Sequence, residues 1–340
     1  MLNIITTDFS EINGPAKVVQ NLIKGLEKIK YPYVINKDIN ATQRCYIPNR
    51  RTALLKLRKA KSRVIVGPNL FLTPYDIPWY ISLRDTIYLQ PSHETIESWE
   101  LFGFNHAPMK VWATGIDTDS FYPVKCNNRK VTIYHKCRKK KELNQIENTL
   151  KEMGIDYYKV IYGGYNEKEY KEILKNTSFI IWHGHQESQG IALQEALASD
   201  IPILVCDVAS WRDQVPRYSW PKPMHNLLDK LRVTAVPYFD DRCGIKIIDL
   251  TKLKEAIEYM QDNLTEFQPR EFIIENLSLE KQAKELISLY DRWGLHVEEG
   301  YGERLLSNEG FSDNRIIRVA DAVCSKCSRW ARSYQRYLHR

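Results

Sequence analysis

Residues 185–199 have the sequence HQESQGIALQEALAS and lie between two apolar runs. The run before them, residues 178–182, reads SFIIW, and the run after them, residues 201–206, reads IPILVC. Short apolar runs of this kind, bounded by polar loops, are typical of buried strands. The stretch therefore predicts a strand, an acidic loop, a helix and a second strand, in that order.

Two glutamates and a glycine mark the loop and the helix as a candidate binding site. Gly190 lies at the expected start of the helix, where backbone N–H groups lack partners, so Gly190 and Ile191 are candidates for holding a phosphate. Glu195 falls about one turn into the helix, where its carboxylate can accept hydrogen bonds from ribose hydroxyls. Glu187 precedes the helix and faces whatever is attached beyond the phosphates. The alternative is an ordinary helix between two strands, with two incidental surface glutamates.

Length and composition indicate a globular protein of two domains. The chain has 340 residues, of which 43% are hydrophobic, and this is ample for two cores. It contains no apolar run of 18 residues, so we expect no membrane-spanning helix, and the N-terminus reads as a short strand rather than a signal peptide. Seven scattered cysteines favour reduced thiols and a cytoplasmic protein.

The order of the predicted elements indicates an α/β fold. Strands and helices alternate in both halves of the chain, which predicts two Rossmann-like domains with parallel sheets facing a cleft. A turn-rich, polar segment at residues 114–130 is the expected linker. We therefore expect an N-terminal domain at 1–122, a C-terminal domain at 123–295 and a tail at 296–340.

The segment at this junction, residues 114–123, reads TGIDTDSFYP. It resembles the signature Asn-Gly-Val-Asp-x-x-x-Phe-x-Pro of retaining, GT-B-type glycosyltransferases of family 4. The two glutamates resemble the E-x7-E signature of the same family, in which Phe usually stands where this chain has Gln189. The resemblance covers most of residues 1–290. It implies that the N-terminal domain is the acceptor side and that the C-terminal domain binds the nucleotide sugar. It implies that a sugar moves from a nucleotide-diphosphate sugar to an acceptor hydroxyl on a glycan, a lipid or a protein, with retention of configuration. Asp117 is expected to shape the hinge or to cap a turn.

The same resemblance assigns roles to the site residues. It places ribose on Glu195, phosphates on Gly190 and Ile191, and sugar hydroxyls on Glu187. After the predicted strand at 131–134 comes a basic cluster in the place where the family grips the donor pyrophosphate with an Arg and a Lys. The residues there are Lys136, Arg138 and Lys141.

In this cluster, Lys136 stands at the Arg position and Lys141 at the Lys position. Lysine keeps the charge but loses the planar fork of a guanidinium, and Arg138 is a candidate to replace it. Fixed cations of this kind stabilise a departing diphosphate without a metal. The alternative interpretation of the cluster is a solvated, basic helix start.

Further candidates carry weaker signals. Gly14 lies in the first strand-to-helix loop, where the family keeps a glycine-rich loop near the donor phosphates, but the same residues also suit a plain turn before a helix-starting proline. His93 follows a strand and is a candidate to lie near the sugar, and the alternative is a helix start capped by Ser92. His183 and His185 are candidates to line the sugar pocket. They lack an adjacent third ligand at metal spacing, so we expect neither a metal nor another cofactor.

The tail at 296–340 is basic and amphipathic. Residues 311–340 hold seven Lys or Arg against two Asp, and Trp and Tyr recur on one helical face. Such a helix lies on an anionic membrane surface, or it packs back across the N-terminal domain. The rest of the chain is near neutral, so we expect no specific nucleic-acid partner, and the location is cytoplasmic or at a membrane surface.

Other functions are compatible with a fold of this kind. One is a non-catalytic protein that binds a nucleotide sugar or nucleic acid, and another is a sugar-nucleotide epimerase. A phosphorylase is a third, but it needs a lysine context for pyridoxal phosphate that is not identified here. Fold analogy alone does not separate these possibilities.

Overall fold

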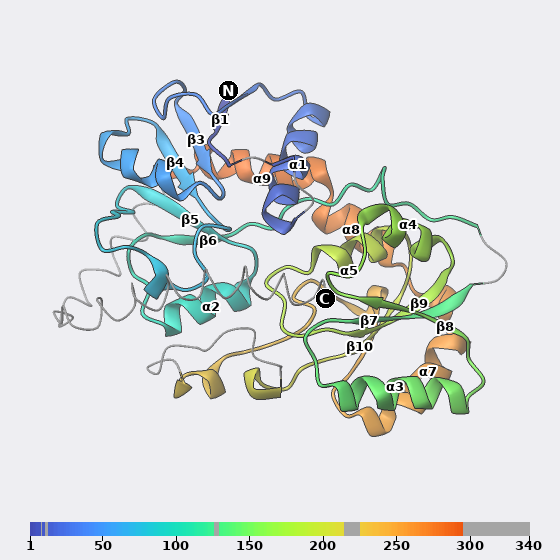
Figure 1. The fold of residues 1–340 in the computed structure, drawn as a ribbon. Helices are drawn as coiled ribbons and strands as arrows, with labels where there is room; N and C mark the ends of the chain where they lie inside the picture. Colours follow the sequence, from blue (N-terminus) through green and yellow to red (C-terminus); the bar gives the residue numbers. More distant parts are fainter. Residues whose placement is uncertain (8, 11–12, 126–128, 214–224, 295–340) are drawn as a thin grey trace.

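The computed structural model describes residues 1–7, 9–10, 13–125, 129–213 and 225–294. These residues form two α/β domains, each built around a parallel sheet (Figure 1). The predicted α/β architecture with two parallel sheets is therefore confirmed. The basic tail predicted at 296–340 lies outside the described residues.

The N-terminal sheet has the strand order β2-β1-β3-β4-β5-β6, and each of its strand pairs is parallel. The strands are β1 (Leu2–Ile4), β2 (Tyr33–Ile35), β3 (Arg44–Ile47), β4 (Arg63–Val66), β5 (Thr86–Gln90) and β6 (Met109–Val111). Its helices are α1 (Gly14–Lys28), the 3-10 helices η1 (Arg51–Lys59) and η2 (Pro74–Asp76), and α2 (His93–Leu101).

Sequence reasoning did not identify β3, which precedes η1 in the chain. The signal for β3 is the short apolar run Cys45, Tyr46 and Ile47, all of which are fully buried.

The C-terminal sheet has the order β11-β10-β9-β7-β8, again with parallel pairs. The strands are β7 (Lys130–His135), β8 (Tyr157–Ile161), β9 (Thr177–His183), β10 (Ile203–Cys206) and β11 (Gly244–Ile247). The α-helices that follow β7 in the chain are α3 (Lys140–Glu152), α4 (Glu167–Lys175), α5 (Ile191–Ala198), α7 (Leu253–Asp262), α8 (Pro269–Leu277) and α9 (Leu279–Asp291). The 3-10 helices are η3 (Trp211–Asp213), η4 (Leu228–Lys230), η5 (Asp241–Cys243), η6 (Leu250–Lys252) and η7 (Leu264–Glu266).

Helices cover both faces of the C-terminal sheet. One core cluster joins the sheet to α4, α5 and α8, and another joins it to α3 and α7. The carboxyl ends of the parallel strands therefore remain at one edge of the sheet, where ligands bind in open α/β folds.

The last described helix, α9, returns to the N-terminal domain and packs beside α1 (Figure 1). Its apolar face, including Leu286 and Tyr290, belongs to the same core cluster as Leu22 and Leu26 of α1. The Tyr290 hydroxyl also donates a hydrogen bond to the Cys45 carbonyl, at 2.6 Å. In packing terms α9 is thus part of the N-terminal domain.

The chain crosses between the domains twice at one place, which we call the neck (residues 113–117 and 277–279). The Ile116 N–H donates to the Leu277 carbonyl at 2.8 Å. A Cβ on Gly115 would lie 2.7 Å from the Leu279 Cα, and a Cβ on Gly25 of α1 would lie 2.5 Å from the Leu279 carbonyl oxygen. Glycine at these two positions lets the backbones approach closely.

Candidate functional site

The start of α5 forms one wall of the site. Gly190 is the N-cap residue, with φ 84° and ψ 50°, a left-handed conformation that favours glycine. The helix begins at Ile191, as predicted, and its first-turn N–H groups are available to an anion by the usual geometry of a helix start. A predicted phosphate site therefore has the required backbone geometry at these two residues.

Lys136 and Glu187 form a close ion pair at the carboxyl edge of the C-terminal sheet. The Lys136 Nζ lies 2.5 Å from Glu187 Oε1, and both side chains are only 10% exposed. The ammonium also lies 4.3 Å from the centroid of the Tyr162 ring, a cation–π distance. Two residues predicted for the pyrophosphate and for the sugar thus contact each other directly.

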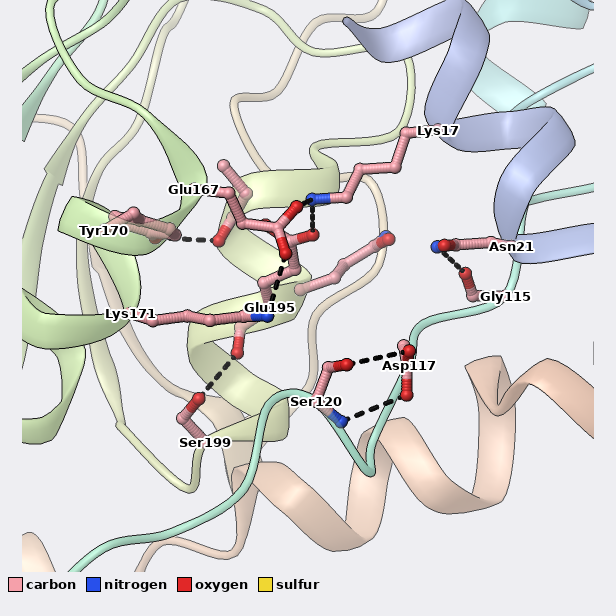
Figure 2. A network of polar contacts seen from close by, with 12 residues as sticks. Lys17, Asn21, Gly115, Asp117, Ser120, Glu167, Tyr170, Lys171, Glu195 and Ser199 are labelled. Atoms are coloured by element: carbon pink, nitrogen blue, oxygen red, sulfur yellow. Dashed lines mark hydrogen bonds and ion pairs between the residues drawn. The ribbon is translucent and has the colours of Figure 1, made fainter. Parts of the chain in front are cut away.

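Glu195 lies on the side of α5 that faces the N-terminal domain, and Lys17 of α1 reaches across to it (Figure 2). The Lys17 Nζ contacts Glu195 Oε1, and it also lies 3.0 Å from Glu167 Oε2 of α4. Glu195 is 4% exposed, and burial raises its pKa to about 7 despite the nearby Lys17. The carboxylate predicted for ribose is therefore engaged by a lysine of the opposite domain.

Sequence reasoning did not identify Lys17, although a signal for it exists. Lys17, Asn21, Lys24 and Lys28 recur at intervals of four, three and four residues, so they share one face of α1. Asn21 Nδ2 donates to the Gly115 carbonyl at 2.7 Å (Figure 2). The Lys24 Nζ lies 2.7 Å from Asp117 Oδ2. Lys28 pairs with Asp119 and Glu280. The polar face of this helix is thus a domain interface.

Asp117 closes a turn at the neck. Its Oδ1 accepts from the backbone N–H groups of Asp119 and Ser120, and its Oδ2 accepts from the Ser120 hydroxyl at 2.9 Å. Burial raises the pKa of this carboxyl, but the hydrogen bonds from Lys24 and Ser120 outweigh that effect and lower it. The predicted turn role of Asp117 is confirmed.

Gln189 and Thr114, two of the residues that differ from the resembled signatures, lie against each other. Gln189, which stands where the family has Phe, accepts from the Thr114 N–H at 3.0 Å and donates to the Thr114 carbonyl at 2.9 Å. Its Nε2 also donates to Gln194 Oε1 at 2.9 Å. This buried amide connects the α5 loop to the neck.

Arg138 is buried among backbone carbonyls. Its Nη1 donates to the Cys206 carbonyl at 3.0 Å and to the Gly184 carbonyl at 3.2 Å, and its Nε lies 3.0 Å from Glu142 Oε2. These bonds connect the ends of β9 and β10 and hold the start of the acidic loop. A contact between Arg138 and the donor stays a prediction.

His183 lies behind the site rather than in the sugar pocket expected from sequence. It is fully buried, with Nε2 at 3.0 Å from Glu142 Oε2 and Nδ1 at 3.0 Å from His135 Nδ1. Burial lowers the pKa of His183 to about 4, so the ring is neutral at pH 7. His185 lies nearer the acidic loop, with its Nδ1 4.0 Å from Glu187 Oε1.

The remaining candidates occupy exposed positions at helix starts. Lys141 lies in the first turn of α3, and His93 is the first residue of α2, whose N-cap Ser92 accepts from the Thr95 N–H at 3.4 Å. Gly14 is the first residue of α1, and a Cβ there would meet nothing within 4 Å. Their roles in donor binding stay predictions.

A cavity of about 550 Å³ adjoins the Lys17 network. It is lined by α4 and the linker, including Phe121, Glu167 and Lys171. Within the described ranges, no three His, Cys, Asp or Glu side chains are grouped closely enough to hold a metal ion. The same ranges contain no helix that is long and apolar enough to cross a membrane.

Comparisons by sequence and by structure give different results. No protein-family model and no curated protein matches the chain. Solved structures match most of it: sucrose-phosphate synthase from Thermosynechococcus elongatus has a TM-score of 0.53 at 10% identity, covering 86% of this chain and 99% of that one.

Two further matches were solved with nucleotides bound. Anabaena HepE in complex with UDP and glucose has a TM-score of 0.53 at 9% identity, covering 86% of this chain and 99% of that one. The catalytic domain of starch synthase IV from Arabidopsis thaliana, bound to ADP and acarbose, has a TM-score of 0.51 at 10% identity, with 86% and 98% covered. The chain therefore has the GT-B fold, with two parallel-sheet, Rossmann-like domains on either side of its site.

Proposed function

We propose that the protein is a retaining glycosyltransferase that moves a sugar from a nucleotide-diphosphate sugar to an acceptor hydroxyl without a metal ion. The observation that carries the proposal is the grouping of Glu187, Lys136 and the α5 start at one sheet edge, with Glu195 one turn further along α5. The signature resemblance supports it, and so does the fold, since HepE was solved with UDP and glucose.

In this proposal the C-terminal domain binds the donor. The N–H groups of Gly190 and Ile191 hold the phosphates, and Glu195 accepts hydrogen bonds from the ribose hydroxyls. Lys136, with Lys141 at the start of α3, stabilises the charge that grows on the departing diphosphate. Lys136 must then exchange Glu187 for the diphosphate, and this frees Glu187 to bind sugar hydroxyls.

The N-terminal domain supplies the acceptor side and Lys17. Because Lys17 occupies the Glu195 carboxylate, ribose and Lys17 compete for it, and donor binding loosens this contact between the domains. The acceptor hydroxyl attacks on the face from which the diphosphate leaves. The leaving phosphate accepts the proton, so a strong side-chain base is not needed. His93, at the start of α2, lies on this acceptor side.

A thermal-shift screen against UDP-, GDP-, ADP- and TDP-sugars tests donor binding. A ligand that binds only the folded state raises Tm, so one nucleotide class is expected to do so. Glu195→Gln should abolish this rise, whereas Glu167→Gln, which removes the other carboxylate on Lys17, should retain it. No rise with any donor, or an equal rise in both variants, contradicts the ribose assignment.

Turnover and stereochemistry need a second measurement. Release of the nucleoside diphosphate separates an enzyme from a non-catalytic binding protein, and NMR of the product anomeric centre tests retention. Lys136→Met should lower kcat by about 100-fold or more, the scale seen when a transition-state charge loses its partner. The matched control, Lys140→Met, removes an exposed cation at the first position of α3.

A further inference from the structure

The N-terminal domain carries a surface that neither the donor site nor the domain interface uses. Residues 39–75 contain eight Lys or Arg and no Asp or Glu. Five of these cations are exposed on or beside η1, at the positions Arg50, Arg51, Lys56, Arg58 and Lys59. A run of one sign over this length indicates an anionic partner.

Large apolar side chains protrude from the same region. Leu55 of η1 is 61% exposed, Leu72 is 66% exposed and Trp79 is 75% exposed. Tyr80 lies beside Trp79, with ring centroids 5.7 Å apart, and is itself exposed. Single exposed apolar residues are ordinary, but a group of them at a cation-rich surface is not.

The cations and the apolar side chains belong to one packed unit. Arg51 Nε donates to the Leu70 carbonyl at 2.5 Å, and its guanidinium lies 5.0 Å from the Phe71 ring centroid. Buried Leu54 and Leu57 of η1 join Leu70 and Phe71 in one core cluster. The buried faces fix η1 and the segment 70–81 to each other, and both lie in the part of the domain around β4 and β5, away from the C-terminal sheet (Figure 1).

We propose that this surface, formed by η1 and residues 72–80, docks the protein on an anionic membrane surface. Lys and Arg attract anionic headgroups, while Trp, Tyr and Leu enter the interfacial layer. A second copy of the chain is disfavoured as the partner, because two cation-rich surfaces repel, and the one carboxylate of η1 and residues 72–80, Asp76, already accepts hydrogen bonds from Thr73. Nucleic acid would satisfy the cations but would leave protruding Leu55 and Leu72 without a counterpart.

The test is co-sedimentation of the full chain with vesicles of phosphatidylcholine, with and without phosphatidylglycerol. The wild-type protein should bind the anionic vesicles, and binding should weaken as salt is raised, because screening shortens the reach of the surface charge. The triple variant K56E/R58E/K59E should lower the partition coefficient by about 100-fold or more, since each lost cation contributes roughly a fivefold factor.

A second variant tests the apolar component. L72S/W79S should lower partitioning by about tenfold or more, because both side chains leave the interface. The matched controls lie in the C-terminal domain, where Ile248 is 65% exposed and Tyr259 is 49% exposed. I248S/Y259S should bind as the wild-type protein does, and circular dichroism verifies that each variant is folded.

Every other outcome overturns the proposal. These outcomes are no binding by the wild-type protein, equal binding to neutral vesicles, or unchanged binding by both surface variants, which would place the membrane contact elsewhere in the chain. Loss of binding to a DNA or RNA probe in the triple variant, with no vesicle binding by the wild-type protein, would assign the surface to nucleic acid. Because vesicles carry no donor, the result is independent of the proposed transferase activity.

Discussion

Lys17 of the N-terminal domain contacts Glu195 of the C-terminal domain, so the carboxylate proposed to hold ribose is already bound to the opposite domain (Figure 2). The Lys17 side chain is 18% exposed and that of Glu195 is 5% exposed. Removing one partner of a pair this deeply buried should lower the free energy of unfolding, because the remaining charge loses its partner and stays shielded from water.

Stability should therefore depend on pH through Glu195. Burial raises the pKa of its carboxyl to about 7, from 4.5. From about pH 5 to about pH 8 the folded state must release a proton that the unfolded chain has already lost, so the free energy of unfolding falls as pH rises. The contribution is at most about 3 kcal/mol. Denaturant unfolding of the wild-type protein and of Glu195→Gln at several pH values measures this contribution. If the free energy of unfolding changed with pH in the same way in both proteins, the prediction would be contradicted.

Replacing Lys17, the other partner of this ion pair, should also destabilise the protein in a pH-dependent way. Lys17→Met leaves an uncompensated carboxylate at pH 8 and should lower the free energy of unfolding by about 3 kcal/mol. At pH 6 the carboxyl is mostly protonated, so the loss should be smaller. Lys24→Met is the control, because Lys24 is half exposed and its loss should cost less than about 1 kcal/mol. A loss equal at both pH values would show that Glu195 is not the partner that matters.

Arg138 should act mainly on stability. Arg138→Met removes the donor to the Gly184 and Cys206 carbonyls and should cost about 2–4 kcal/mol, since buried acceptors are left without partners. The exposed Lys140→Met should stay within about 0.5 kcal/mol of the wild-type protein. If Arg138→Met instead kept full stability and lost only the Tm rise with donor, Arg138 would be a donor ligand.

Gly115→Ala should destabilise the neck. The added Cβ would lie 2.7 Å from the Leu279 Cα, and backbone cannot move aside as a side chain can, so we expect a loss of about 2–3 kcal/mol. Gly14→Ala is the matched substitution, because its Cβ meets nothing within 4 Å. Thermal unfolding of the two variants should differ by several degrees, and equal Tm values would contradict the close approach.

The local pattern of the sequence predicted the fold class and most strands correctly, because apolar runs and turn residues act over a few positions. The helix start at Ile191 and the turn at Asp117 were predictable for the same reason. The Lys17–Glu195 pair was not, because its partners lie 178 residues apart and meet only when the domains pack. Arg138 was predicted as a candidate donor ligand, and its burial among backbone carbonyls was not predictable, since nothing in a basic run shows which cation the strand ends will bury.

The neck also limits how the domains can move. Both covalent connections pass through it side by side, at Ile116 and Leu277, so the domains can swing about this point but cannot slide apart there. Lys17 lies eight residues along α1 from Gly25, which contacts the neck, so the two residues are about 12 Å apart along the helix. A rotation of the N-terminal domain by about 10° about the neck would therefore move Lys17 by about 2 Å. That distance is enough to break the contact between Lys17 and Glu195, so a small pivot at the neck decides whether the two domains touch at this pair.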